Sequence, residues 1–220
     1  MIEQIEIRNL LPCVFAGMED TDRIRSSQIW EEPSFVFHRG CRLCVHAESG
    51  NGKSSLLHFI YGSRKDYKGS ILFDGTDISA LSIVQWCDVR TKGIALLPQD
   101  MALFPELTVG QNIDLKNNMT HHKTSEQIKD LLARLGIDDK HDVAAGKLSI
   151  GQMQRVALVR AVCQPFDFIF LDEPVSHLDA RNNKIVADII TEEANNQGAG
   201  IISTSVGNHL MLDNAKFVSL

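Results

Sequence analysis

The chain has 220 residues, of which 44% are hydrophobic and 23% charged, and this length suffices for one sizeable α/β domain. The formal net charge of -6 gives no basic excess of the kind that dedicated nucleic-acid binders carry, so we expect no nucleic-acid partner. No apolar run reaches the roughly 18 residues of a membrane-spanning helix, and the amino terminus lacks a signal-peptide pattern. We therefore expect a cytoplasmic protein that reaches a membrane only through a partner.

The first half of the chain predicts mostly strands. Alternating apolar residues favour strands at 2–10 and 34–40, and the polar stretch 17–33 between them predicts a surface loop or a hairpin. Four more elements follow in order: a strand at 42–47, a helix at 52–62, a strand at 69–78 that ends in an Asp-Gly turn, and a buried strand at 93–100.

One cysteine-rich stretch offers two interpretations. Cys41 and Cys44 lie with His38 and His46 at spacings loosely like those of a zinc site. Side chains at positions 41 and 44 point to opposite faces of a strand, so they cannot share one metal ion. We therefore interpret the stretch as a buried strand, and the five cysteines of the chain as thiols.

The second half of the chain alternates helices with apolar strands. From 104 to about 147 it is polar and helical, and the capping box Thr124–Gln127 opens a helix in which apolar residues recur at helical spacing. The remaining elements are helices at 148–162 and 181–196 and strands at 166–174, 200–205 and 216–220. This alternation indicates a mostly parallel α/β sheet.

The stretch HAESGNGKSS (46–55) contains most of a phosphate-binding loop, placed between an apolar strand and a helix. In such a loop the backbone N–H groups wrap the phosphates, a lysine contacts them, and a hydroxyl holds Mg²⁺. Ala47 replaces the first glycine of the pattern, which costs about 1 kcal/mol if that position needs a positive φ.

Two acids support a nucleotide site. Asp172 and Glu173 end an apolar strand, where NTPases with such a loop place the carboxylate that holds Mg²⁺. Ligands of an open α/β sheet bind at the carboxyl ends of its strands, so the loop and the acids point into one crevice. We therefore predict a P-loop NTPase core that binds a nucleotide and Mg²⁺.

Further motifs resemble those of the ATP-binding cassette (ABC) family, in the family's order and over nearly the whole chain. LSIGQ (148–152) resembles the LSGGQ signature, LLPQD (96–100) the Q-loop, SHLD (176–179) the D-loop, and 103–113 the stretch after the Q-loop. The resemblance implies a single ABC ATP-binding domain over 1–220. It also implies a small antiparallel β lobe near the N-terminus and a helical signature subdomain at about 104–163.

The resemblance assigns roles to residues around the nucleotide. The phosphate-binding residues would be Ser49, Gly50, Asn51, Gly52, Lys53, Ser54 and Ser55. Ser54, Gln99 and Asp172 would hold Mg²⁺, and Gln99 would also sense the attacking water and link to the membrane partner. Glu173 would be the general base. Phe15 is the candidate for stacking on adenine, with Trp30 second.

The signature also has a physical basis in the residues. Ser149 and Gln152 form a capping box, and the free N–H groups of such a helix start bind phosphate. The resemblance implies that Ser149, Gly151 and Gln152 reach ATP held by a second cassette, and that Asp179 shapes the contact between the two. ATP would then join a homo- or heterodimer, and hydrolysis would reopen it.

Two departures concern hydrolysis. Ile150 replaces a signature glycine, and its branched side chain is expected to weaken closure. Ser205 stands where the family has a catalytic switch histidine that bonds the γ-phosphate, which predicts slower hydrolysis with binding retained. His209, at most about 13 Å further along an extended chain, is the alternative switch residue.

We therefore expect the ATP-hydrolysing subunit of an ABC transporter, acting on a separate transmembrane permease at the inner face of the cell membrane. The alternative is a weakly hydrolysing or regulatory cassette paired with a competent one. Non-transport ABC proteins usually carry two cassettes in one chain or a long coiled coil, and this sequence shows one cassette and no coiled coil. A P-loop kinase would not account for the LSIGQ and SHLD motifs.

Overall fold

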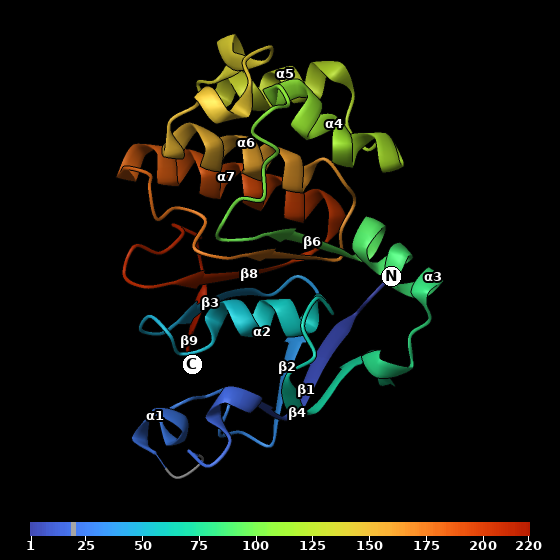
Figure 1. Ribbon diagram of the computed structural model, residues 1–220, viewed down its shortest axis with the longest axis vertical. Helices are drawn as coiled ribbons and strands as arrows, with labels where there is room; N and C mark the ends of the chain where they lie inside the picture. The colour runs from blue at the N-terminus through green and yellow to red at the C-terminus, as the bar shows by residue number, and fades with distance from the viewer. Residues whose placement is uncertain (19–20) are drawn as a thin grey trace.

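Two β-sheets form the centre of the computed structural model, which describes residues 1–18 and 21–220 (Figure 1). The parallel sheet has the strand order β6-β7-β8-β3-β9. Its strands are β3 (Arg42–His46), β6 (Ile94–Leu97), β7 (Phe168–Leu171), β8 (Gly200–Ser205) and β9 (Lys216–Ser219). The antiparallel sheet, β2-β1-β4-β5, consists of β1 (Gln4–Pro12), β2 (Ser34–His38), β4 (Tyr67–Phe73) and β5 (Thr76–Asp77).

The parallel sheet is covered on both faces. In Figure 1, α6 (Ile150–Val162) and α7 (Ala180–Gln197) lie above it, and α2 (Lys53–Ile60) lies below it. Because side chains alternate along a strand, Ile169 and Leu171 of β7 join the core under α6 and α7, whereas Phe168 and Phe170 join the core around α2. This two-sided burial explains why the strand is a continuous apolar run.

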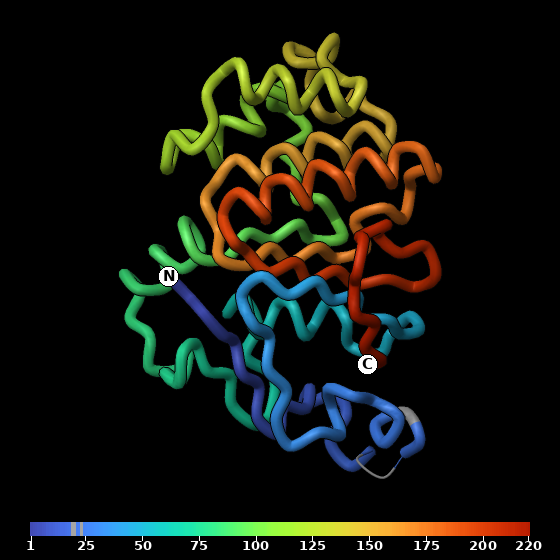
Figure 2. Tube along the Cα trace, turned by 180° about the vertical axis from the view of Figure 1, so that it is seen from behind, coloured from blue at the N-terminus to red at the C-terminus, as the bar shows by residue number. Residues whose placement is uncertain are grey.

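Helices α4 (Val109–Thr120) and α5 (Ser125–Arg134) lie at the end of the molecule opposite α1 (Asp22–Arg25) (Figures 1 and 2). The capping box Thr124–Gln127 forms as predicted, with the Gln127 N–H 3.2 Å from Thr124 Oγ1. Helix α4 begins with a similar box at Thr108. Both helices share one apolar core with α6 and α7. The limits of a helical subdomain stay a prediction.

Short helical segments complete the described chain. They are α3 (Ile83–Asp88), a π-helical turn at Val89–Gly93, and 3-10 turns at Cys13–Phe15, Ile78–Ala80, Asp138–Lys140 and Ala145–Lys147. Within the described ranges, no helix is both long and apolar enough to cross a membrane.

The prediction of a surface loop at 17–33 is wrong for part of that stretch. Ile24, Ile29 and Trp30 are buried in the core around α2, with exposed fractions of 3%, 1% and 5%. Polar residues separate Ile24 from the adjacent pair Ile29 and Trp30, and the three show no regular period, so the local pattern gave no sign of their burial. Residues 19 and 20 lie outside the described residues.

The strand prediction for the cysteine-rich stretch is confirmed, because β3 runs from Arg42 to His46 with Cys44 buried. Cys41 lies just before the strand, and burial raises the pKa of its thiol to about 11. Among the described residues, no three His, Cys, Asp or Glu side chains are grouped so that they could hold a metal ion.

Candidate active site

The predicted phosphate loop connects β3 to α2. Gly50 and Gly52 have φ values of 84° and 93°, a conformation that favours glycine. Gly52 also allows a close approach, because a Cβ atom there would lie 3.2 Å from the Trp30 ring and 3.4 Å from the Phe15 ring. The chain therefore needs glycine at position 52 for both its backbone conformation and its packing.

Ala47 fits the loop without strain. Its φ lies outside the left-handed region, so the cost that we attached to a positive φ does not arise. The residue is 5% exposed, and its carbonyl accepts a hydrogen bond of 2.9 Å from Lys53 Nζ. This departure from the glycine pattern therefore leaves the loop geometry intact.

Lys53 is almost fully buried at the base of the loop. Its ammonium donates to the carbonyls of Ala47 and Glu48 and lies 3.9 Å from Glu173 Oε1. Burial lowers the pKa of Lys53, and the negative charges of Glu173 and Asp172 oppose this effect. A phosphate oxygen would offer the ammonium a charge-assisted hydrogen bond, which is stronger than one to a neutral carbonyl.

Asp172 provides the test of whether a divalent cation fits. Its Oδ1 accepts a 2.6 Å hydrogen bond from Thr204 Oγ1, whereas its buried Oδ2 has no hydrogen-bond partner among the described residues. A buried, unpaired carboxylate oxygen is costly, and a cation would satisfy it. Ser54, Gln99 and Asp172 line one cavity of about 460 Å³. These oxygen donors fit Mg²⁺.

Glu173 lies next to this cavity in an unusual backbone conformation. Its φ is 51°, which costs a residue other than glycine about 1–2 kcal/mol. The residue lines a second cavity of about 190 Å³ together with Gln99 and the loop residues Ser49, Gly50, Gly52, Lys53, Ser54 and Ser55. Since both cavities include Ser54 and Gln99, the structure brings the predicted phosphate, metal and base residues together.

Ser205 does not line either of these two cavities. Its hydroxyl lies 3.6 Å from Cys44 Sγ, and the residue is 1% exposed. Because side chains alternate along β8, the neighbouring Thr204 points to Asp172 instead. This arrangement argues against the predicted catalytic role of Ser205. His209 is exposed, and its ring packs edge-on against Phe217.

Phe15 and Trp30, the two candidates for adenine stacking, both pack against Gly52 of the phosphate loop. Trp30 is 5% exposed and donates from Nε1 to the carbonyl of Asn51 at 3.2 Å, so it supports the loop. Phe15 lines the 190 Å³ cavity but is only 4% exposed, whereas its neighbour Val14 is 69% exposed. Adenine stacking on Phe15 stays a prediction.

The signature forms the start of α6, as predicted. Gln152 N–H donates to Ser149 Oγ, and Ser149 N–H donates to Gln152 Oε1 at 2.9 Å. Ile150 beside them is 51% exposed. Gly151 packs against the D-loop, since a Cβ there would lie 3.3 Å from the carbonyl oxygen of His177.

Asp179, predicted at the contact between cassettes, caps α7. Its Oδ1 accepts a 2.8 Å hydrogen bond from the N–H of Asn182, and hydrogen bonding from Asn182 lowers the pKa of Asp179. This local role accounts for an acid at the position. A contact with a second cassette is a further, separate prediction.

Sequence reasoning missed two residues of the site. Thr204 binds both Asp172 Oδ1 and the N–H of Glu173, and Gln154 donates to the Glu173 carbonyl. The sequence around Thr204 gives no sign that this threonine belongs to the site, because threonine is common in β-strands. Gln154 did offer a signal, because it is a polar residue on the otherwise apolar, buried face of α6.

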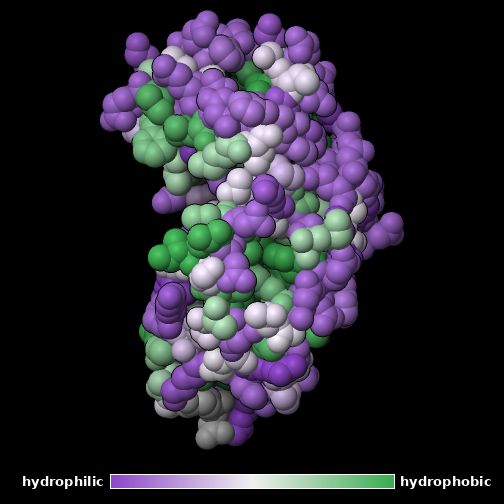
Figure 3. All heavy atoms as spheres, turned by 90° about the vertical axis from the view of Figure 1, so that its right-hand side faces the viewer, coloured by the Kyte–Doolittle hydropathy of each residue, from purple (hydrophilic) through white to green (hydrophobic). Residues whose placement is uncertain are grey.

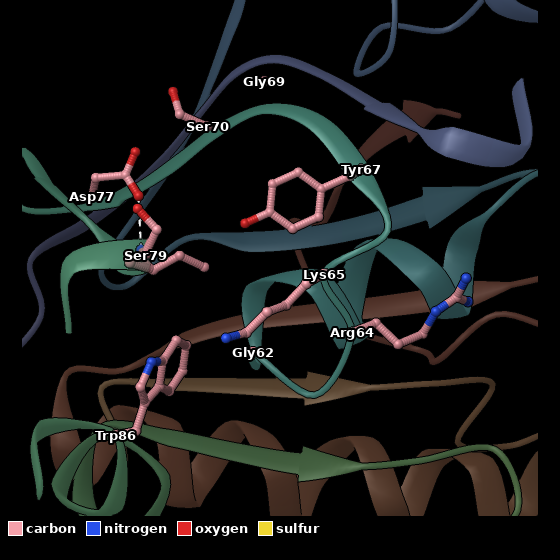
Figure 4. Close-up of a pocket in the computed structure, with 10 residues that line it drawn as sticks. Gly62, Arg64, Lys65, Tyr67, Gly69, Ser70, Asp77, Ser79 and Trp86 are labelled. Atoms are coloured by element: carbon pink, nitrogen blue, oxygen red, sulfur yellow. Dashed lines mark hydrogen bonds between the residues drawn. The ribbon is translucent and has the colours of Figure 1, made fainter. Parts of the chain in front are cut away.

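A further cavity of about 250 Å³ lies between the end of α2, β4 and α3 (Figure 4). Lys65 and Tyr67 point into it toward Trp86 and Ser79, whereas Arg64 turns away. The N–H of Ser79 donates to Asp77 Oδ1 at its edge. The cavity is lined by none of the predicted site residues, so we separate it from the nucleotide site.

The loop between a parallel strand and a helix, with acids ending another strand of the same sheet, defines an α/β protein of the P-loop NTPase class. The family model described as ABC transporter matches residues 30–176. The chain belongs to the ABC transporter family, as an ATP-binding subunit. The predictions of family and fold class are therefore confirmed.

Individual relatives agree with this assignment. The chain is 31% identical over 175 residues to the lipoprotein-releasing system ATP-binding protein LolD of Buchnera aphidicola subsp. Schizaphis graminum, covering 78% of this chain and 76% of that protein. It is 30% identical over 167 residues to the ABC transporter ATP-binding protein YtrE of Bacillus subtilis, covering 74% and 72%. A dimeric ATP-binding cassette in a post-hydrolysis state has a similar fold, with a TM-score of 0.72, 19% identity and coverage of 93% and 88%.

We expect Lys53→Ala to abolish ATP binding at micromolar concentrations, because the lost ammonium faces the most highly charged part of the nucleotide. Titration with a fluorescent ATP analogue measures this loss. Lys65→Ala, which removes an exposed lysine from the separate cavity, is the matched control and should bind as the parent does. Unchanged affinity in Lys53→Ala would exclude the loop as the nucleotide site.

Proposed function

We propose that the protein binds and hydrolyses ATP, pairs with a second cassette when ATP is bound, and thereby drives a separate membrane permease. The observation that carries this proposal is the convergence of Lys53, Asp172 and Glu173 on two adjoining cavities. The membership of the ABC family, whose cassettes are ATPases, supports it. A similar fold that is a dimer bound to ADP and Pi supports the pairing.

In the proposed reaction the protein positions the phosphates and removes one proton. Lys53 binds the phosphates from the base of the loop, and Ser54, Gln99 and Asp172 hold Mg²⁺, which neutralises phosphate charge when bound. Water attacks the γ-phosphorus, the bond to ADP breaks, and the Glu173 carboxylate accepts the proton of the water. The contact of 3.9 Å between Glu173 and Lys53 keeps this base near the phosphates.

The start of α6 supports a contact with a second nucleotide. Its free N–H groups and helix dipole favour a phosphate, and Ser149, Gly151 and Gln152 lie at its surface beside the D-loop. Exposed Ile150 lies at the same helix start, so it would meet the approaching cassette. We propose that closure is correspondingly weak.

Slow hydrolysis is part of the proposal. The position after Thr204 carries a buried serine whose hydroxyl contacts Cys44, and His209 packs against Phe217. Because the Ser205 hydroxyl is engaged by Cys44 and the His209 ring by Phe217, we propose that neither donates to a γ-phosphate. The second candidate function, a regulatory cassette paired with a competent one, rests on this observation.

A face around α3 and α4 is suited to a membrane partner. Figure 3 shows apolar atoms gathered on the side of the molecule where α3 and the end of α4 lie in Figure 1. Exposed apolar side chains in this region are Ile83, Val84, Phe104, Leu115 and Met119. Groups of this kind on a protein surface favour an apolar partner.

Lys116 of α4 lies near the charges of Arg160 and Arg90, and Arg160 also lies near the acid Asp100. Burial lowers the pKa of Lys116, and the nearby charges of Arg160 and Arg90 lower it further. Such a group of cations favours an acidic partner. We therefore propose that a segment of the permease with apolar and acidic side chains docks here and holds the protein at the inner face of the cell membrane.

We expect Glu173→Gln to bind ATP with little turnover and to form an ATP-dependent dimer, because the base is lost while the phosphate and Mg²⁺ contacts remain. Sizing chromatography with and without ATP, together with phosphate release, measures both effects. Glu32→Gln, at an exposed glutamate, is the control. An unchanged rate of hydrolysis would remove Glu173 from the mechanism.

We expect Ser205→His to leave kcat and ATP affinity within about twofold of the parent, because the side chain at this position points to Cys44 and not to the phosphates. Turnover and nucleotide titration measure the two quantities, and thermal melting checks the fold. A several-fold rise in kcat would show that an imidazole at this position reaches the γ-phosphate, and would contradict this interpretation. If His209→Ala abolishes turnover in the parent, His209 serves as the switch and this interpretation is wrong.

We expect Lys116→Glu to reduce several-fold the fraction of the protein that sediments with membranes from its own cells. The substitution replaces one cation of the proposed docking face with an acid. The new carboxylate would also pair with Arg160 and Arg90, so fewer positive charges would remain to attract an acidic partner. Lys129→Glu on α5 is the matched control. Equal membrane association of the two variants would contradict the proposed face.

A further inference from the structure

Gln154 connects α6 to the turn that carries Glu173. The residue is 4% exposed, and its amide bonds only to that turn in the described contacts. Nε2 donates to the Glu173 carbonyl at 3.0 Å and to Ser176 Oγ at 3.3 Å. Oε1 accepts from the N–H of His177 at 3.3 Å. The side chain is therefore committed to holding 173–177 against α6.

The Glu173 backbone is held from both sides. Its N–H donates to Thr204 Oγ1 at 3.1 Å, and its carbonyl accepts from Gln154 Nε2 at 3.0 Å and from the N–H of Ser176 at 3.3 Å. These bonds restrain the two peptide groups that flank the Cα atom of Glu173. Because each peptide group is planar, they restrain φ and ψ at this residue, and with them the direction of its Cβ atom.

This restraint matters because φ at Glu173 is 51°. A glutamate left to its own preference adopts a negative φ, which would rotate its side chain to another direction. Strained backbone of this kind persists only where its surroundings over-determine it. Gln154 and Thr204 are the side chains that hold the two ends of this residue.

We propose that Gln154 is a positioning residue for ATP hydrolysis, which keeps the Glu173 carboxylate at the phosphate cavity by holding its carbonyl. Gln154 does not line that cavity and acts through Glu173. The inference rests on the proposed role of Glu173 as general base. Nucleotide binding, which depends on Lys53 and the loop, is independent of Gln154.

The first test is Gln154→Leu, which keeps the approximate size of the side chain and removes its hydrogen bonds. We expect kcat to fall at least tenfold, while the Kd for a fluorescent ATP analogue changes less than twofold. Gln164→Leu is the matched control, because Gln164 is also buried and donates to two carbonyls, those of Arg90 and Ile94, away from Glu173. Gln164→Leu should lower the melting temperature comparably and leave kcat within twofold.

The second test separates a positioning role from a general loss of structure. In a Glu173→Gln background, Gln154→Leu should reduce the residual single-turnover rate no further, because a residue that acts only through the base loses its effect when the base is gone. An undiminished effect of Gln154→Leu in that background, or an equal loss of kcat in Gln164→Leu, would overturn the proposal.

A third measurement does not depend on hydrolysis. Hydrogen–deuterium exchange of the segment 172–178 should be faster in Gln154→Leu than in the parent and in Gln164→Leu. Unchanged exchange would overturn the inference even if the protein hydrolyses no ATP. Absence of hydrolysis in the parent would instead count against the proposed function alone.

Discussion

The site depends on one hydroxyl group that joins two strand ends. Thr204 Oγ1, at the end of β8, donates to Asp172 Oδ1 and accepts from the N–H of Glu173 after β7. The first bond leaves the other oxygen of Asp172 free for a cation, and the second holds the peptide group before the proposed base. Because β8 lies between β7 and β3, the same pairing sets the distance from these acids to the phosphate loop.

The site retains features that oppose stability. Asp172 Oδ2 is buried without a partner among the described residues, Glu173 has a positive φ, and Lys53 is buried with a lowered pKa. A bound Mg²⁺ would pair with Asp172 Oδ2, and a phosphate would offer the Lys53 ammonium a charged partner. These two features are therefore suited to a cation and an anion together.

The departures from the family pattern have unequal physical consequences. Ala47 costs little, because its backbone is not left-handed. Ile150 is an exposed side chain at the start of α6, so it leaves the packing of the phosphate loop unchanged. Ser205 replaces a histidine with a buried side chain whose hydroxyl contacts Cys44 inside the protein.

The sequence by itself determined the family and most of the strands and helices, without α1 and α3, and it indicated a candidate phosphate loop. These follow from signals that are local, such as glycines before a helix, capping boxes at Thr124 and Ser149, and the apolar run that ends at Asp172. Only the tertiary structure decided the burial of Trp30 and which side chains of β8 face the site. Ser205 and Cys44 are 161 residues apart, and no local pattern reports which of two strand faces meets a distant neighbour. The roles of Gln154 and Thr204 depend on contacts of the same long-range kind.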